Sequence, residues 1–236
     1  MSKAVVYTGR AMEFENHREV THVTVADGVT EVKTQAFYGC KGLTNLSFLE
    51  GSAITTIGDF AFSESGIASL QWMERVRKIG SYAFQQCENL RTIEGLCCEE
   101  MGDACFYMCI LLQSMKGWPA SMTVIPGGCF WRCIGMTTVD CDLSHVTSIG
   151  VTPLGTHAFA GCTSLLPPSL SARDADPAAV LAYLKRKSKD ERMLARYAIY
   201  ASVRRARDQE EEPRTDESSA PLAFALAKLP PVVVQR

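Results

Sequence analysis

A chain of 236 residues and 25.9 kDa has room for one domain or two small ones. Hydrophobic residues make up 47% of it, and the net charge of −2 excludes a polycation that binds nucleic acid through its overall charge. No apolar run approaches 18 residues, so the sequence predicts no membrane-spanning helix. Residues 1–18 lack an apolar stretch behind a basic start, so we expect no secretory signal and a cytoplasmic location.

Residues 1–19 are expected to form a separate N-terminal segment, and a repeat follows them. His22–Val25 predicts the final strand of an incomplete coil ahead of the first full one. Phenylalanine then returns every 22 to 29 residues, at Phe37, Phe62, Phe84, Phe106, Phe130 and Phe159. An apolar anchor lies five residues before each of the first five, and a cysteine or serine lies three residues after every one. The last anchor, Ile149, lies ten residues before its phenylalanine, which predicts a five-residue insertion at Val151–Gly155.

Each copy predicts one coil of a stack. The leucine and isoleucine slots represented by Leu90 and Ile93 predict a short strand with its apolar side chains on one face. The stretch from Gly80 to Cys87 predicts one or two helical turns with one buried face. The second copy is one residue short and offers Ile67 in the leucine slot. No coil of this size buries its apolar face alone, so the copies must stack as a solenoid.

The clearest copy, residues 76–93, reads VRKIGSYAFQQCENLRTI. It resembles the coils of the BspA-like, or treponemal-type, class of leucine-rich repeats, and the resemblance spans residues 20–168. It departs from that pattern where Ser164–Pro168 replaces the last strand, which makes this copy the expected C-terminal cap. The resemblance implies an α/β solenoid: a leucine-rich-repeat horseshoe of six to seven coils with a short C-terminal helical segment.

Nine of the ten cysteines fall in slots of the repeat, which predicts small, inert, buried side chains; Cys97 alone has no such slot. A zinc site is the alternative, because Cys105, Cys109, Cys129 and Cys133 occupy equivalent slots of adjacent coils. The repeat already accounts for all four thiols, so we expect no metal, no redox thiol pair and no other cofactor.

The sequence offers no recognisable catalytic site. The histidines lie at unrelated positions of the repeat: His17, His22, His145 and His157. The chain contains no nucleophile elbow, no Walker phosphate-binding loop and no dinucleotide-binding glycine motif. We therefore expect a protein that is not an enzyme.

The resemblance implies that a partner would bind the concave strand ladder. The residues that flank the buried leucine and isoleucine slots point outward there, and they are Asn45, Ser47, Ser69, Gln71, Thr92, Glu94, Ser114, Lys116, Thr138 and Asp140. This set lacks the tyrosine, tryptophan and arginine of binding hot spots, so an ordinary solvated face is an equal alternative. We expect Trp72 and Trp118 to cap the core at strand ends, and Trp131 to be partly exposed on the convex side.

The composition changes at Pro167–Pro168, and residues 169–207 are expected to form a basic helical segment. Asp176 and Pro177 predict a helix start, with helices over 178–187 and 189–207. The segment can cap the last coil through Met193, Leu194, Tyr197 and Ala201, dock a partner protein, or contact anionic lipid or nucleic acid. We favour the cap, with a secondary partner contact through 185–207. Residues 208–236 are expected to be an acidic linker and a disordered tail with a short helix at 222–229.

These patterns together favour a non-enzymatic protein–protein interaction module, acting as an intracellular adaptor or scaffold. Its partner is expected to be a protein, and nucleic acid is not expected. One alternative is a cell-surface adhesion-type repeat protein, a role associated with the BspA-like family. The other is a metal-stapled or catalytic repeat protein.

Overall fold

The computed structural model describes residues 3–49 and 53–210, and only the backbone at 197, 200 and 203–210. The chain divides into two compact units, Met1–Arg196 and Tyr197–Arg236, which are treated separately. Apart from residues 208–210, the expected acidic linker and tail lie outside the described residues, and so does the expected helix at 222–229.

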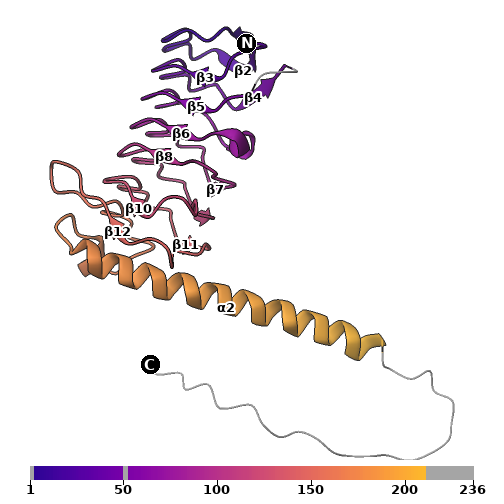
Figure 1. Ribbon diagram of the computed structural model, residues 1–236. Helices are drawn as coiled ribbons and strands as arrows, with labels where there is room; N and C mark the ends of the chain where they lie inside the picture. Colours follow the sequence, from indigo (N-terminus) through magenta and orange to yellow (C-terminus); the bar gives the residue numbers. More distant parts are fainter. Residues whose placement is uncertain (1–2, 50–52, 211–236) are drawn as a thin grey trace, which may run out of the picture. The chain divides into compact units, whose positions relative to one another are not determined.

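The first unit is a stack of coils held together by two ladders of parallel strands (Figure 1). The first ladder contains, in order, β1 (Lys3–Tyr7), β2 (Val20–Val25), β4 (Asn45–Phe48), then β7 (Thr92–Glu94), β9 (Ser114–Lys116) and β11 (Thr138–Val139). The second ladder contains β3 (Glu31–Val32), β5 (Thr56–Ile57), β6 (Lys78–Ile79), β8 (Glu100–Met101), then β10 (Val124–Ile125) and β12 (Ser148–Ile149). The predicted leucine-rich-repeat solenoid is confirmed.

A column of phenylalanine rings runs through the core of the stack. Successive centroids lie 5.1–5.8 Å apart with interplanar angles of 3–25°, along Phe14, Phe37, Phe62, Phe84, Phe106, Phe130 and Phe159. The column begins one coil earlier than the sequence suggested, because Phe14 lies 23 residues before Phe37 and stacks on it. Residues 3–19, which were expected to precede the repeat, therefore belong to the stack: β1 pairs with β2, and Tyr7 packs on Phe37.

The third side of each coil is a series of β-turns, and the expectation of helical turns there was wrong. Within one coil, the N–H of Cys40 donates to the carbonyl of Phe37, closing a turn at 3.2 Å. The N–H of Phe37 donates instead to the carbonyl of Ala61 in the next coil, at 2.8 Å. Residues such as Gln35 and Tyr82 adopt left-handed backbone angles, with φ of 55° and 58°. This conformation interrupts a helix and turns alternate N–H groups toward the neighbouring coil.

The cysteine slot has a specific role in joining these turns. The Cys109 thiol donates to the carbonyl of Phe84 in the preceding coil, with sulfur and oxygen 3.1 Å apart. The same bond is made by the thiols of Cys40, Cys87, Cys133 and Cys162, at 2.9–3.2 Å. The slot therefore requires a small side chain that fits a closed core and still donates a hydrogen bond. In the second coil Ser65 occupies this slot, and its hydroxyl lies 3.6 Å from the thiol of Cys87.

Each ladder is broken once, at an irregular copy of the repeat. The second copy is one residue short before Leu70, and the residues after Leu70 form the 3₁₀ helix η1 (Gln71–Arg75) where a first-ladder strand was expected. In the second ladder, Gly102 donates its N–H to the carbonyl of Ile79 at 2.8 Å. Proline occupies the equivalent slot at Pro126 and has no N–H to donate, so β8 and β10 do not pair.

The C-terminal part contains a short helix α1 (Pro168–Ser171) and one continuous helix α2 (Pro177–Glu210), rather than the two helices expected. The start of α2 is as predicted, because the Asp176 carboxylate accepts the N–H groups of Ala178 and Ala179 at 3.1 and 3.2 Å. No glycine or proline interrupts residues 178–210, and the Ser188 hydroxyl donates to the carbonyl of Cys141 without breaking the helix.

Helix α2 caps the end of the first ladder with its early turns only. Its buried side chains are Val180, Leu181, Leu184 and Ser188. The carboxylate of Glu191 accepts the N–H of Val139 on β11, at 3.1 Å, so it satisfies a donor at the ladder's edge. The expectation that the cap continues through Met193 and Leu194 was wrong, because these side chains are 47% and 68% exposed.

The phenylalanine column predicts a large difference between two substitutions in one coil. Phe84→Ala removes a fully buried ring and should lower the free energy of unfolding by about 3–5 kcal/mol. Glu94→Ala removes a half-exposed carboxylate 3.9 Å from Lys116 and should change it by less than about 0.5 kcal/mol. Urea titration of both variants measures the difference, and equal shifts of the midpoint would contradict the assignment of the core.

Candidate functional site

The outward-facing residues of the first ladder form the candidate surface, here called the strand face. The strand register places Thr92, Ser114 and Thr138 in one row, and Glu94 beside Lys116 in the next. On β4, Asn45 and Ser47 lie beside His22 and Thr24 of β2. The remaining predicted members, Ser69, Gln71 and Asp140, are also exposed, but they lie outside the strands.

Much of the polar chemistry of the strand face is satisfied within the molecule. The hydroxyls of Thr24 and Ser47 lie 3.0 Å apart, and the Ser114 hydroxyl lies 3.4 Å from that of Thr92. The Lys116 ammonium lies 3.9 Å from a carboxylate oxygen of Glu94. The regular part of the face is therefore flat, hydroxyl-rich and close to neutral, and it offers a partner little that is unpaired.

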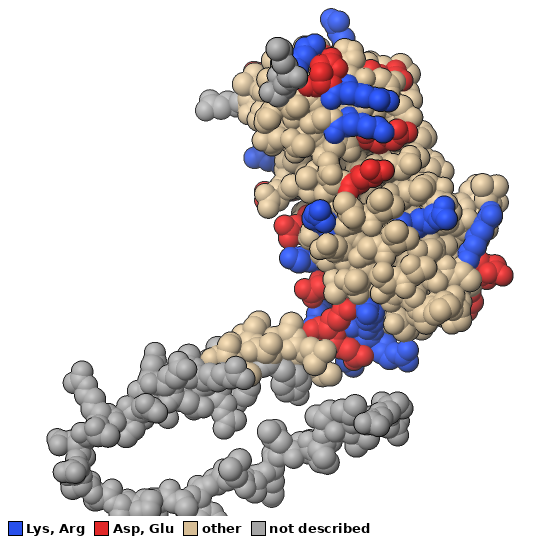
Figure 2. All heavy atoms as spheres, turned by 180° about the vertical axis from the view of Figure 1, so that it is seen from behind, with Lys and Arg blue, Asp and Glu red and all other residues tan. Residues whose placement is uncertain are grey.

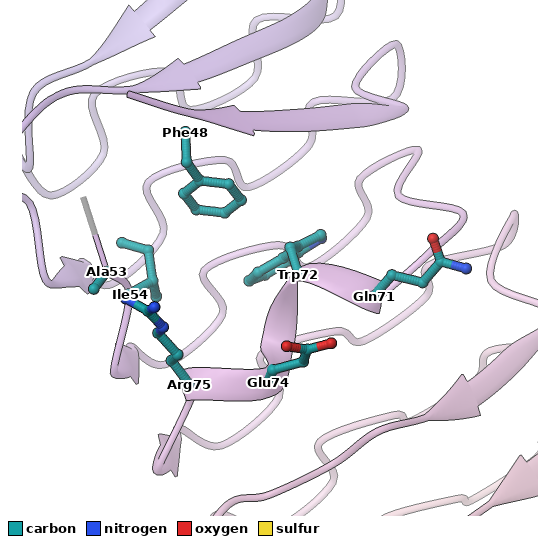
Figure 3. A pocket seen from close by; sticks show the side chains of 7 residues that line it. All are labelled: Phe48, Ala53, Ile54, Gln71, Trp72, Glu74 and Arg75. Atoms are coloured by element: carbon teal, nitrogen blue, oxygen red, sulfur yellow. The ribbon is translucent and has the colours of Figure 1, made fainter. Parts of the chain in front are cut away.

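The break in the first ladder changes this surface. Between β4 and β7, the 3₁₀ helix η1 borders a pocket of about 440 Å³, here called the ladder-break pocket. It is lined by Phe48, Ala53, Ile54, Gln71, Trp72, Glu74 and Arg75. Figure 3 shows the rings of Phe48 and Trp72 beside one another on the pocket wall, with Glu74 and Arg75 at its rim.

Trp72 forms one wall of the ladder-break pocket and also contacts the core. Its ring lies 5.5 Å from Phe62 of the column and 6.1 Å from Phe48, and its indole N–H donates to the carbonyl of Ser69 at 3.2 Å. The side chain is fixed by these contacts yet half-exposed. At the rim, Glu74 and Arg75 are exposed and form no ion pair within the described residues.

Sequence reasoning missed this pocket. It treated Trp72 as a cap at a strand end and did not select Phe48, Glu74 or Arg75. The available signal was the irregular second copy, because the missing residue before Leu70 breaks the regular spacing at this strand. The expectation for Trp118 was correct as to burial: it is 6% exposed and its ring lies 6.2 Å from Phe130. Trp131 is partly exposed, as predicted.

The four thiols considered for zinc have other surroundings. Cys109 and Cys133 donate to phenylalanine carbonyls, and Cys129 lies 3.6 Å from the sulfur of Met101. Burial raises the pKa of Cys105, Cys109 and Cys133 well above the ordinary thiol value. Over residues 3–49 and 53–210, no group of three or more histidine, cysteine or acidic side chains is arranged to hold a metal ion.

The histidines do not meet at a common site in the described residues. His157 is buried, its ring nitrogen lies 2.9 Å from the carbonyl of Ala172, and burial lowers its pKa. The ring of His145 lies 3.0 Å from the carbonyl of Pro119, and His17 lies 3.9 Å from Glu19. These contacts anchor loops and chain turns, and they form no nucleophile–base pair.

The charged groups on one face of the molecule are mixed in sign. Figure 2 shows lysine and arginine close to aspartate and glutamate on this face, with uncharged surface between them. Individual pairs on the second ladder follow the same pattern, such as Lys78 with Glu100 at 2.7 Å. No helix within the described residues is long and apolar enough to cross a membrane.

The buried thiols predict a protein that is sensitive to alkali. Burial raises the pKa of Cys40, Cys87, Cys98, Cys141 and Cys162 to about 12. Thiols in the unfolded chain lose their protons near pH 9. As the pH rises, ionisation therefore lowers the free energy of the unfolded state before that of the folded state. Each buried thiol then costs the fold up to about 1.4 kcal/mol per pH unit between about pH 9 and 12. Nine of the ten thiols are buried.

We therefore expect the urea midpoint to be nearly constant from pH 7 to 8.5 and to fall steeply above pH 9, under reducing conditions. The exposed Cys97 serves as the control, because Cys97→Ser should leave the pH profile unchanged. A midpoint that holds from pH 8 to pH 11 would show that the thiols are not buried as described.

Comparison with known proteins agrees with this geometry. A family model for the BspA type leucine rich repeat region matches six copies over residues 10–137. A leucine-rich repeat protein of Treponema pallidum is 23% identical, with a TM-score of 0.51 over 69% of this chain and 82% of that one. A leucine-rich cell surface protein of Faecalibacterium prausnitzii is 19% identical, with a TM-score of 0.46 over 70% of this chain and 62% of that one. No curated protein matches the sequence. The matched copies cover more than half of the sequence, and the chain belongs to the BspA-type leucine-rich repeat family.

Proposed function

We propose that this chain is a non-enzymatic protein-interaction module that acts as an intracellular adaptor or scaffold. It binds a partner protein on the strand face, and the ladder-break pocket receives a side chain of that partner. The observation that carries the proposal is the pocket itself, because it places two aromatic walls within an otherwise flat polar surface. Leucine-rich repeat proteins of this kind are generally interaction modules, which supports the choice of class.

The pocket supplies an aromatic side chain and an arginine, which the rest of the strand face lacks. Binding energy at protein interfaces is concentrated in a few aromatic or arginine residues that fill or line well-packed pockets. Trp72 is held rigid by its contacts with Phe62 and Ser69, so little conformational entropy is lost when a partner covers it. The unpaired charges of Glu74 and Arg75 at the rim can pair with opposite charges around the inserted side chain.

Two observations support an intracellular role over a surface or metal-dependent one. All ten cysteines are free, and nine of them are buried donors or packing groups that oxidation would disturb. Such a composition suits a reducing compartment. Of the thiols considered for zinc, those of Cys109 and Cys133 donate to phenylalanine carbonyls of the preceding coil.

The proposal predicts that partner capture depends on the ladder-break pocket. The full chain, Trp72→Ala and Arg75→Glu are compared by affinity purification from source cells with quantitative mass spectrometry. Loss of a hot-spot tryptophan typically weakens binding by about 2 kcal/mol or more, or about thirtyfold. Arg75→Glu is the second variant, because Arg75 is exposed and its loss leaves the core intact.

Thr30→Arg is the matched control, because it places a bulky charge at an exposed position beside β3 of the second ladder. We expect it to retain the partners that the two pocket variants lose. Partners that survive both pocket variants, with all proteins folded by circular dichroism, would refute binding at this pocket.

A second candidate interaction element is the later part of α2. Met193 and Leu194 are 47% and 68% exposed, and Ile199 is 64% exposed, although the earlier turns of the same helix are buried. Arg196 is also exposed. An exposed helix that carries apolar and basic side chains fits the helix-in-groove mode of recognition, which supports partner docking over capping for these turns.

Two leucines of α2 that lie ten residues apart, Leu184 and Leu194, test this assignment. Leu184→Ala should lower the free energy of unfolding by about 2–5 kcal/mol, because the side chain is fully buried against the last coil. Leu194→Ala should change it by less than about 0.5 kcal/mol while reducing partner capture. If Leu194→Ala destabilises the chain as much as Leu184→Ala, these turns serve as a cap and the docking role fails.

A further inference from the structure

A second row of aromatic side chains lies on the outside of the turns, separate from the buried phenylalanine column. Phe60 stacks on Tyr82 with centroids 4.9 Å apart, and Tyr82 contacts Tyr107 at 6.0 Å. Tyr107 stacks on Trp131 at 4.4 Å, and the guanidinium carbon of Arg132 lies 4.9 Å from the centroid of Trp131. We call these five residues the aromatic ridge. Its four rings are half-buried; Phe60 and Tyr82 stack, Tyr107 and Trp131 stack, and the two pairs meet at a tilt of 58°.

The repeat does not require this ridge. Phe60 and Tyr82 lie two residues before a column phenylalanine, whereas Tyr107 and Trp131 lie one residue after one. Several other coils fill these two slots with small or polar residues, namely Gln35, Ser63, Gln85, Ala104 and Gly128, although Tyr38 and His157 also occupy them. A coil can therefore be stable without an aromatic side chain in these slots.

The polar ends of the ridge have no partner within the described residues. The indole N–H groups of Trp72 and Trp118 each donate to a backbone carbonyl, at 3.2 and 3.1 Å, but that of Trp131 donates to none. Likewise, the Tyr38 hydroxyl donates to Glu64 at 3.0 Å. The hydroxyls of Tyr82 and Tyr107 have no such acceptor, and Arg132 forms no ion pair in the described part of the chain.

Two aspartates of these turns accept backbone N–H groups and keep their negative charge. A carboxylate oxygen of Asp59 accepts the N–H of Ser81 at 2.8 Å, and one of Asp103 accepts the N–H of Gly127 at 2.9 Å. Each of these bonds joins one coil to the next. The ridge therefore offers four hydrogen-bond donor groups: two phenol hydroxyls, one indole N–H and one guanidinium. The guanidinium gives the ridge a single positive charge.

We propose that the aromatic ridge is a second interaction surface, which binds an acidic segment of a partner protein. Tyrosine, tryptophan and arginine are the residue types that dominate interface hot spots, and the strand face lacks all three outside its pocket. The unpaired guanidinium selects a carboxylate, and the hydroxyls and indole N–H supply further donors to carboxylates and backbone carbonyls. This surface is independent of the proposed site around Trp72.

The test uses a phage-displayed library of random twelve-residue peptides, selected on the full chain at low and moderate salt. The probe for quantitative work is the most enriched peptide, synthesised and measured by fluorescence anisotropy. We expect enriched sequences to carry at least two aspartate or glutamate residues and to bind less tightly as salt rises. Arg132→Gln should weaken the measured peptide about tenfold or more, and Y82F with Y107F together by a similar factor.

These variants keep the rings in place, so their melting temperatures should match that of the parent chain. Lys116→Gln removes a basic group from the strand face and should not affect the peptide, and Trp72→Ala should also leave its affinity unchanged. The proposal fails if no peptide is enriched, if the enriched peptides are not acidic, or if they bind the ridge variants normally. Ridge-dependent binding on a glycan array without peptide binding would also refute it.

Discussion

The fold depends on the burial of one phenylalanine ring per coil between its neighbours. A single coil exposes both faces of its ring, and only stacking removes them from water. The rings form a column with spacings of 5.1–5.8 Å, which lies within the range of favourable aromatic contacts. Hydrogen bonds beside each ring also join one coil to the next. The N–H of Phe37 donates to the next coil, while thiols such as that of Cys109 donate to a phenylalanine carbonyl of the previous one.

Regular slots provide stability, and the irregular copies create surface features. An altered residue count around Leu70 removes a strand and leaves a pocket beside Trp72. Proline in a glycine slot at Pro126 removes a backbone donor and separates β8 from β10. Aromatic residues in the free turn slots, such as Tyr107, build a ridge over the coils without changing the core. A repeat protein can thus gain binding sites at a few positions while the remaining copies keep the stack intact.

The sequence predicted the stack well because its core slots recur in register, and each recurrence is independent support. It also predicted the Asp176 cap and the buried cysteines. It missed the Phe14 coil, because that copy has His17 where the other six have a cysteine or serine. It placed helical turns where β-turns occur, since the apolar spacing of the two is alike and only the left-handed residues distinguish them. The ladder-break pocket depends on how one irregular copy folds between regular neighbours, which a repeat pattern does not specify.

Native-state amide hydrogen exchange, resolved to single residues, tests most directly whether stacked turns hold the coils together. The amides of Phe37, Phe62, Phe84 and Phe106 each donate to the next coil, so they should exchange only through global unfolding and with one common free energy. The amides of α2 at residues 193–196, whose side chains are exposed, should exchange much faster. Fast exchange at the phenylalanine amides, with slow exchange retained in the strands, would show that the turn side does not join the coils and would contradict this account.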